Sequence, residues 1–275
     1  MILKFAAGVT LYNPSEKEIE HLKLLDETFE EIFLFDNSEP DYNKPQYTFS
    51  SLKFQIISEN ENKGLSYAFN EIIKKCDKYD FLCLLDQDSI FENDEINKIK
   101  DLLSNGDNRE FGIVAPFVDY GFANHVPSKT LEKKQKVITS GSFLNLNVVR
   151  KEQIHFDENY FIDKFEIDLC QQLVVLGYNI MMYHDSVLHQ SIGEKSGHSH
   201  PNHNPLRHYY LFRNRFCFND KWYSGIKKYT LNVLQTSRHL LLIILYEKNK
   251  LNKIRMLPRA LSDYMKGRMG KINNE

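Results

Sequence analysis

Short apolar segments alternate with amphipathic segments along the first two thirds of the chain. The apolar segments predict strands at Val9–Tyr12, Ile32–Phe35, Phe54–Ile57, Phe81–Leu85, Gly112–Phe117 and Val137–Leu144. The amphipathic segments predict helices at Ser15–Phe29, Leu65–Lys75, Glu92–Leu103 and Glu166–Leu176. Glu18 follows Ser15 by three residues, a spacing that predicts a capping box at the start of the first helix. Such alternation is typical of βαβ units, so it predicts an α/β fold with a largely parallel sheet.

The last part of the chain, residues 206–275, has a helical pattern throughout. Its final segment, 221–275, contains twelve Lys and Arg but only three acidic residues, a balance of +9, whereas the whole chain has a net charge of −2. We therefore predict two parts: a domain over 1–220 and a basic, amphipathic helical segment over 221–275. The apolar stripe of this segment has three interpretations: it lies on an anionic membrane surface, packs on the first domain, or forms a homodimer.

Composition narrows the class of protein. The 275 residues are 42% hydrophobic, which suits a folded globular chain, and the near-neutral charge gives no reason to expect nucleic acid as a partner. The longest apolar run, Leu240–Tyr246, is far shorter than the ~20 residues that span a bilayer. The four cysteines form no paired motif and are expected to be reduced. These features predict a cytoplasmic protein, either soluble or peripheral on the inner face of the cell membrane.

Polar side chains follow the predicted strands. Asp36-Asn37-Ser38 follows the second strand, and Asp86-Gln87-Asp88-Ser89 follows the fourth. In parallel sheets the ligand lies beyond the carboxyl ends of the strands, so these residues are candidates for function. Two carboxylates at i and i+2 after a buried strand can hold a divalent cation that also binds a diphosphate. The alternative for each segment is an ordinary solvated turn.

Several short motifs occur in an order that resembles glycosyltransferase family 2, and most of all its bacterial rhamnosyltransferases. They are Thr10-Leu11-Tyr12-Asn13, Asp36-Asn37-Ser38, Asn62-Lys63-Gly64 with Asn70, Asp86-Gln87-Asp88-Ser89, Ser140-Gly141-Ser142, Phe161-Ile162-Asp163, and Tyr209-Tyr210 with Arg213-Asn214. The resemblance covers about residues 5–220. It implies a GT-A fold, which has a Rossmann-like, mostly parallel sheet, followed here by the C-terminal helical appendage. It also implies a nucleotide-sugar donor, a divalent metal (Mg²⁺ or Mn²⁺) and inversion at the anomeric carbon.

The resemblance also implies roles for individual residues. Asp86 and Asp88 would bind the metal, with His189 at a position where related enzymes place a histidine on the metal or the diphosphate. The donor would be bound by Thr10, Tyr12, Asn13, Asp36, Asn37, Lys63, Gly64, Asn70, Asp86, Gln87 and Arg213. Arg207 and Arg215 flank Arg213 in sequence, and all three have the bidentate geometry that suits a diphosphate.

An inverting transferase needs a general base for the acceptor hydroxyl. In the family this base is usually an Asp shortly before a helix, and by register the position here is Glu166, which is one methylene longer. Asp163 is the alternative base. A purely structural alternative is that Glu166 and Asp168 stabilise a helix N-terminus.

Together these features predict transfer of L-rhamnose from dTDP-rhamnose to a cell-surface polysaccharide acceptor, which relatives often carry on polyprenyl diphosphate. Two alternatives remain open. In the first, the donor is a UDP-hexose or UDP-galactofuranose. In the second, the chain is a nucleotide-sugar-binding subunit without turnover, which is suggested by Glu166 at the position of the base.

Overall fold

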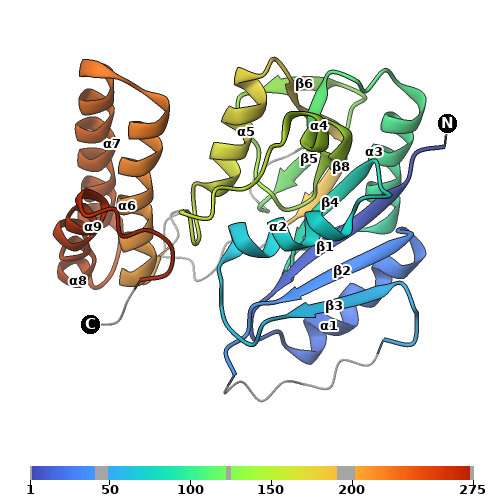
Figure 1. Cartoon of the computed structure of the whole chain (residues 1–275), viewed down its shortest axis with the longest axis horizontal. Coiled ribbons are helices and arrows are strands. Elements are labelled where there is room, and N and C mark those ends of the chain that lie inside the picture. Colours follow the sequence, from blue (N-terminus) through green and yellow to red (C-terminus); the bar gives the residue numbers. More distant parts are fainter. Residues whose placement is uncertain (1, 41–48, 122–124, 191–201, 273–275) are drawn as a thin grey trace. The chain divides into compact units, whose positions relative to one another are not determined.

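A computed structural model describes residues 2–40, 49–121, 125–190 and 202–272 (Figure 1). The chain forms two compact units. The α/β unit comprises residues 1–157 and 166–191, and the helical unit comprises residues 158–165 and 192–275. The sequence placed the boundary at residue 220, but the structure groups residues 192–220 with the C-terminal helices.

The α/β unit contains an eight-stranded sheet within the described residues, with strand order β3-β2-β1-β4-β7-β5-β8-β6. Strands β3, β2, β1 and β4 are parallel, β7 is antiparallel to both its neighbours, β8 is parallel to β5, and β6 is antiparallel to β8. The strands are β1 (Phe5–Leu11), β2 (Glu31–Asp36), β3 (Phe54–Ser58), β4 (Phe81–Asp86), β5 (Phe111–Asp119), β6 (Leu131–Lys134), β7 (Ser142–Asn145) and β8 (Asn179–His189). The prediction of an α/β fold with a mostly parallel sheet is confirmed.

Helices cover both faces of this sheet. They are α1 (Glu16–Leu22), the 3-10 helix η1 (Lys23–Glu27), α2 (Leu65–Lys75), α3 (Asn93–Asn105), α4 (Leu146–Glu152) and α5 (Phe165–Val175). Apolar side chains of α1, η1 and α3 pack into one core cluster with Val9, Leu34 and Leu85 of the strands. On the other face α2 lies so close to β1 that a Cβ on Gly8 would come within 2.8 Å of Ile72. Glycine at this position therefore permits the packing of α2 on the sheet.

One predicted strand is shorter than expected. The β-branched residues of Val137–Leu144 suggested a strand throughout, but the strand begins only at Ser142. Before it, Gly141 has a φ of +78° and donates its N–H to the carbonyl of Leu84 at 2.7 Å. A residue with this φ cannot continue a strand, and glycine adopts it without steric cost. The turn brings Ser140 beside the end of β4.

The helical unit consists, in its described part, of α6 (Pro205–Trp222), α7 (Gly225–Tyr246), α8 (Lys250–Ile254) and α9 (Met256–Met265). Figure 1 shows α6 and α7 as two long neighbouring helices. Buried aromatic residues of α6 form one core with Ile243 of α7 and Ala260 of α9. Because α6 supplies most of this core, the helices after residue 220 cannot form a separate part without it. None of the described helices is long and apolar enough to cross a membrane.

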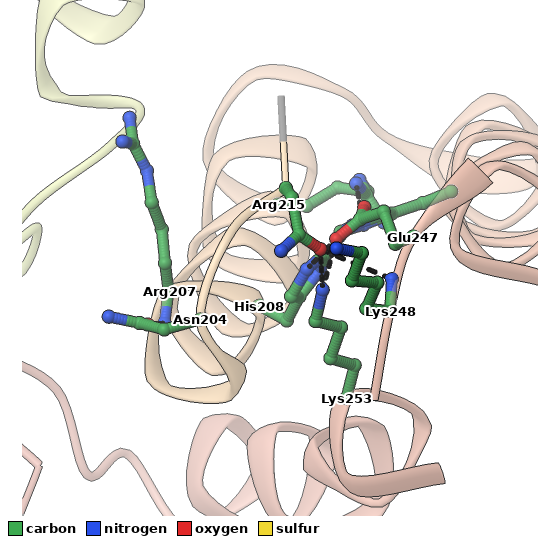
Figure 2. Close-up of polar contacts among 9 residues, drawn as sticks. Asn204, Arg207, His208, Arg215, Glu247, Lys248 and Lys253 are labelled. Atoms are coloured by element: carbon green, nitrogen blue, oxygen red, sulfur yellow. Dashed lines mark hydrogen bonds and ion pairs between the residues drawn. The ribbon is translucent and has the colours of Figure 1, made fainter. Parts of the chain in front are cut away.

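A chain of polar side chains crosses the interior of the helical unit (Figure 2). The guanidinium of Arg215 lies 2.9 Å from Nδ1 of His239, and Nε2 of His239 lies 2.9 Å from Nδ1 of His208. Nε2 of His208 lies 2.9 Å from Glu247, whose carboxylate also pairs with Lys253 at 2.6 Å. Because arginine can only donate, each imidazole must accept at Nδ1 and donate from Nε2, so both are neutral. The network fixes one tautomer for each histidine.

This network predicts that acid destabilises the helical unit. The pKa of His239 is lowered from 6.5 to about 3, mainly because burial disfavours the charged ring and further because the guanidinium of Arg215 is positive. The unfolded chain therefore binds a proton at His239 between these two values and the folded chain does not. Stability is complete above pH 6.5 and declines as the pH falls toward 3, by up to about 1.4 kcal/mol per pH unit.

Urea denaturation at pH values from about 7.5 to 4.5 measures this dependence. The His239→Gln variant should lose less stability with acid than the wild type does. The control His155→Gln alters an exposed histidine of the α/β unit and should keep the wild-type slope. Equal slopes in the wild type and His239→Gln would show that His239 does not titrate as described.

Candidate active site

Two carboxylates lie at the carboxyl edge of the sheet, one on each side of β1. Thr10 of β1 is in register with Asp86 of β4, and Leu11 is in register with Asp36 of β2. Asp36 is buried, and its Oδ1 accepts the N–H of Ser38 at 2.9 Å. Asp86 is half-buried. The structure thus brings together strand-end residues that are far apart in the sequence, as the parallel arrangement predicts.

The turn after β4 is tied to β8 and to the Ser140 turn. The N–H of Asp86 donates to Oγ of Ser140 at 3.2 Å, and the hydroxyls of Ser140 and Ser89 lie 2.5 Å apart. Ile90 exchanges two backbone hydrogen bonds of 3.1 Å with His189. His189, the last residue of β8, therefore lies beside Ile90, which directly follows the Asp86–Ser89 turn. Its exposed ring has Nδ1 at 3.5 Å from Asp119.

Asp88 is at the exposed outer position of this turn. Its pKa is raised above the ordinary value, first because the surrounding protein desolvates the carboxylate and also because Glu18 is negative, while the backbone N–H of Asp88 lowers it. Both of the effects that raise the pKa disfavour the ionised form. A bound cation would oppose both, because it supplies the opposite charge.

Gln87 joins the turn after β4 to the end of β1. The N–H of Tyr12 donates to Oε1 of Gln87 at 2.6 Å, and Nε2 of Gln87 donates to the carbonyl of Tyr12 at 3.2 Å. The same Nε2 donates to Glu18 at 3.1 Å. Glu18 in turn forms the predicted capping box with Ser15, which is confirmed. Gln87 was expected to contact the donor, and the structure places its amide on the protein backbone.

Asn37 holds the next loop in the same way. Its Nδ2 donates to the carbonyl of Gly64 at 3.2 Å, and its Oδ1 accepts the N–H of Lys63 at 3.0 Å. Gly64 has a φ of +87° at the start of α2, where a side chain would be strained. The ammonium of Lys63 pairs with Glu61 at 2.7 Å. Asn37 therefore sets the position of the loop that begins α2.

Tyr12 and Asn13 form the end of β1 at this edge. Tyr12 is 48% exposed, so its ring can contact a ligand. Asn13 has a φ of +47°, and its N–H donates to Oγ of Ser38 at 2.8 Å. The β1 and β2 ends are thereby linked beside Asp36. The roles of Tyr12, Asn13 and Asp36 in donor binding stay predictions.

Asn70 is a third amide that binds backbone. It lies in α2, and its Nδ2 and Oδ1 pair with the carbonyl and the N–H of Phe156, both at 2.9 Å. Both Asn70 and Phe156 are buried. This pair fixes the segment that follows α4 against α2. Asn70 was expected near the donor, and its observed partner is backbone.

Substitution of Asn70 by Ala should lower the free energy of unfolding by about 1–3 kcal/mol, because it leaves the buried N–H and C=O of Phe156 without this partner. Urea denaturation monitored by circular dichroism measures the change. The matched control is Asn97→Ala, which alters an exposed asparagine of α3 and should not destabilise the chain. A loss in Asn70→Ala no larger than in the control would contradict the assigned contact.

The predicted metal ligands are Asp86, Asp88 and His189. Within the residues described, no group of three or more His, Cys, Asp or Glu side chains is arranged to hold a metal ion. Mg²⁺ is commonly bound by one or two carboxylates together with substrate phosphates and water. Two carboxylates on the turn after β4 fit this kind of site, in which the donor supplies the remaining oxygens.

Two carboxylates were proposed as the base. Glu166 lies half-buried in the first turn of α5, and the neighbouring Asp168 is fully buried and accepts a hydrogen bond from Gln172 at 2.9 Å. Asp163 belongs to the helical unit and forms an ion pair with Arg207 at 3.0 Å. Asp163 thus already has a cationic partner within its own unit. This contact favours Glu166.

Arg213 and Arg215 occupy interior positions of the helical unit. Arg213 is 1% exposed, and its guanidinium donates to the carbonyls of Arg268 and Gly270 and lies over the rings of Tyr209 and Tyr210. Arg215 contacts His239 in the buried network. These arginines were expected at the diphosphate, and their observed contacts hold the helical unit together.

Ser140 and Glu18 contribute to the site although neither was predicted as a site residue. Ser140 contacts both Asp86 and Ser89. Its signal in the sequence is the Ser140-Gly141-Ser142 motif, in which Gly141 forms a turn. Glu18 has no such signal, because its capping role already explains an acidic residue there.

Strand-end carboxylates on a Rossmann-like sheet are typical of nucleotide-binding α/β proteins, and comparison with known proteins gives the family of this chain. The family described as Glycosyl transferase family 2 matches residues 16–161, and the chain belongs to this family. Among curated proteins it is 26% identical over 234 residues to dTDP-rhamnosyl transferase RfbF of Shigella flexneri, across 78% of this chain and 76% of that protein.

Solved structures show the same fold. The first 349 residues of S. aureus TarS, solved in complex with UDP-GlcNAc, match with a TM-score of 0.61 and 15% identity, covering 96% of this chain and 81% of TarS 1–349. GalNAc-T7 with UDP, GalNAc and Mn²⁺ matches with a TM-score of 0.58 and 11% identity, covering 77% of this chain and 48% of that one. At these identities the likeness shows the fold alone, which is GT-A. The predicted fold and family are confirmed.

Proposed function

We propose that this glycosyltransferase transfers L-rhamnose from dTDP-rhamnose, with inversion, to the acceptor of a cell-surface polysaccharide. The observation that carries the proposal is the placement of Asp36 and Asp86 on either side of β1, with Asp88 two residues further, in a chain of this family. The likeness to a dTDP-rhamnosyl transferase supports the choice of donor. A polyprenyl-diphosphate carrier of the acceptor is part of the same proposal.

The proposed donor lies across the carboxyl edge of the α/β unit. Asp36 and the exposed Tyr12 contact the nucleoside, while Asn37 and Gln87 keep the loops at Lys63 and Tyr12 in position. Because each amide binds backbone at both its ends, these loops are preorganised before the donor arrives. Asp86 and Asp88 would hold a divalent cation, whose charge would offset that of the diphosphate.

In the chemical step, the oxygen of an acceptor hydroxyl forms a bond to the anomeric carbon of rhamnose. The bond from that carbon to the phosphate oxygen breaks, and dTDP leaves with the bonding electron pair. Glu166 accepts the proton of the hydroxyl. Asp86 and Asp88 would hold Mg²⁺ or Mn²⁺, which when bound neutralises charge on the diphosphate. His189 lies on the strand beside this turn and is the third candidate ligand.

Two other functions are alternatives to be tested. A UDP-sugar as donor is supported by two structures of the same fold, of which one was solved with UDP-GlcNAc and the other with UDP and GalNAc. A binding subunit without turnover is suggested only by Glu where the family usually has Asp.

Thermal-shift measurements with a panel of nucleotide-sugars and Mg²⁺ or Mn²⁺ test the choice of donor. A ligand present at a hundred times its dissociation constant stabilises the folded chain by about 2.7 kcal/mol. We expect dTDP-rhamnose with the cation to raise the melting temperature more than UDP-glucose, UDP-galactose or UDP-galactofuranose does. A larger shift with a UDP-sugar than with dTDP-rhamnose would reject the proposed donor.

A further inference from the structure

Helix α7 has its polar side inward. Asn232 and Gln235 both lie within hydrogen-bond distance of Nδ2 of Asn219 in α6, at 2.7 and 3.2 Å. One turn further, Thr236 and His239 contact the guanidinium of Arg215. Among its apolar residues only Ile243 is fully buried. Besides the apolar contact of Ile243, α7 therefore meets α6 through several polar pairs, which include the histidine network.

The outer side of the same helix is apolar. We call this side the α7 face, and its members are each at least 49% exposed: Ile226, Tyr229, Val233, Leu234, Leu241, Ile244 and Leu245. They recur at helical spacing and so form a continuous stripe along the helix, over roughly 28 Å at 1.5 Å per residue. A helix on the surface of a globular protein normally buries its apolar side and exposes its polar side. The reversed arrangement in α7 indicates that something apolar covers this face.

Positive charge borders and extends the α7 face. Lys227 and Arg238 are exposed and eleven residues apart, which is three helical turns, so they lie on one line beside Leu234, Leu241 and Leu245. Over the described residues 221–272, every charged side chain of the exposed class is basic: Lys221, Lys227, Arg238, Lys248, Lys250, Arg255, Arg259, Lys266, Arg268 and Lys271. The two acidic residues in this range are Glu247, which is buried on Lys253, and Asp263, which is half-buried.

We infer that the α7 face lies flat on an anionic lipid bilayer. An apolar stripe with a basic border is the pattern of a helix that enters the headgroup boundary without crossing the membrane. The polar inner side of α7 stays on α6, so binding requires no unfolding of the helical unit.

A second copy of the chain fits the same surface less well. Two α7 faces brought together would also bring together two borders made of Lys227 and Arg238, and like charges repel. Anionic headgroups supply the opposite charge, and each basic residue near the bilayer surface adds to the electrostatic attraction. The charge of the surface therefore selects lipid over self-association.

Flotation of the full-length chain with liposomes tests the inference. Vesicles of phosphatidylcholine with about 30% phosphatidylglycerol should bind the protein, neutral phosphatidylcholine vesicles should not, and 1 M salt should weaken binding because the Debye length falls to about 3 Å. The double variant Val233→Gln/Ile244→Gln and the variant Lys227→Gln/Arg238→Gln should each bind at least about tenfold more weakly. The matched control Val175→Gln changes an exposed valine of α5 and should bind as the wild type does.

All the substituted residues are exposed, so circular dichroism and donor-induced thermal shifts should remain those of the wild type. Absence of binding to anionic vesicles at low salt, or equal binding by the double variant and wild type, would overturn the inference. Analytical ultracentrifugation without lipid tests the rival explanation, in which a second copy of the chain covers the α7 face. A dimer in the wild type that dissociates in Val233→Gln/Ile244→Gln would assign the α7 face to self-association and would also overturn it.

Discussion

Substitution of Glu166 by Gln is expected to lower the turnover number about 10²- to 10⁴-fold while donor affinity stays at the wild-type value. The substitution keeps the size and shape of the side chain but removes its ability to take the acceptor proton. Steady-state kinetics with acceptor and a separate titration of dTDP-rhamnose measure the two effects. The pattern expected is a fall in kcat without a change in donor dissociation constant.

The comparison variant for this result is Asp163→Asn. Asp163 contacts Arg207 within the helical unit, so its substitution should alter the free energy of unfolding more than the chemical step. Near-normal turnover in Glu166→Gln together with a loss of turnover in Asp163→Asn would move the base to Asp163. Loss of donor binding in Glu166→Gln would show that Glu166 acts before the chemical step.

Substitution of Asp88 by Asn is expected to weaken cation-dependent binding of dTDP by about 10–100-fold or more. The variant removes one of two carboxylates available for the cation and leaves charge on the diphosphate uncompensated. Calorimetric titration of dTDP with Mg²⁺, with Mn²⁺ and with EDTA measures the dependence. In the wild type, EDTA should abolish most of the affinity.

The control for Asp88→Asn is Asp94→Asn, an exposed carboxylate in the first turn of α3, where the helix dipole favours a negative charge. This variant should bind dTDP as the wild type does, with the same cation dependence. If Asp88→Asn also retained wild-type affinity and cation dependence, Asp88 would not be a metal ligand and the proposed roles of the turn after β4 would have to be reassigned.

Much of the α/β unit could be predicted because its local patterns agree with its tertiary structure. The helix over Leu65–Lys75 is found at the predicted residues, and the capping box of Ser15 and Glu18 forms as expected. Strand-end positions of Asp36 and Asp86 follow from the apolar runs before them. Strand β8 was harder to predict, since its half-buried residues interrupt the apolar pattern.

The roles of the amides could not be predicted from residue type. An amide side chain can donate and accept, so it suits a ligand and a backbone segment equally well. Only the structure shows that Asn37, Asn70 and Gln87 each bind backbone of a segment distant in sequence. Amide side chains near the carboxyl edge of the sheet therefore hold loops in place, whether or not they also contact the donor.

The division of the chain into units also depended on tertiary contacts. Charge changes near residue 220, but α6 continues through that point and shares its aromatic core with α7 and α9. Similarly, the pattern of α7 shows that the helix has an apolar side without showing which side is buried. Its polar partners on α6, Asn219 and Arg215, decide that orientation.

Release of nucleotide from defined donors is the most direct test of the proposed function. The full-length chain is incubated with dTDP-L-rhamnose, UDP-glucose or UDP-galactofuranose, with Mg²⁺ or Mn²⁺ and with EDTA, and free dTDP or UDP is quantified by chromatography. We predict cation-dependent release of dTDP and of rhamnose from dTDP-L-rhamnose, with little UDP from the other donors. Release of UDP at a higher rate than dTDP, or binding of dTDP-L-rhamnose without release of any nucleotide even when acceptor is supplied, would contradict the account.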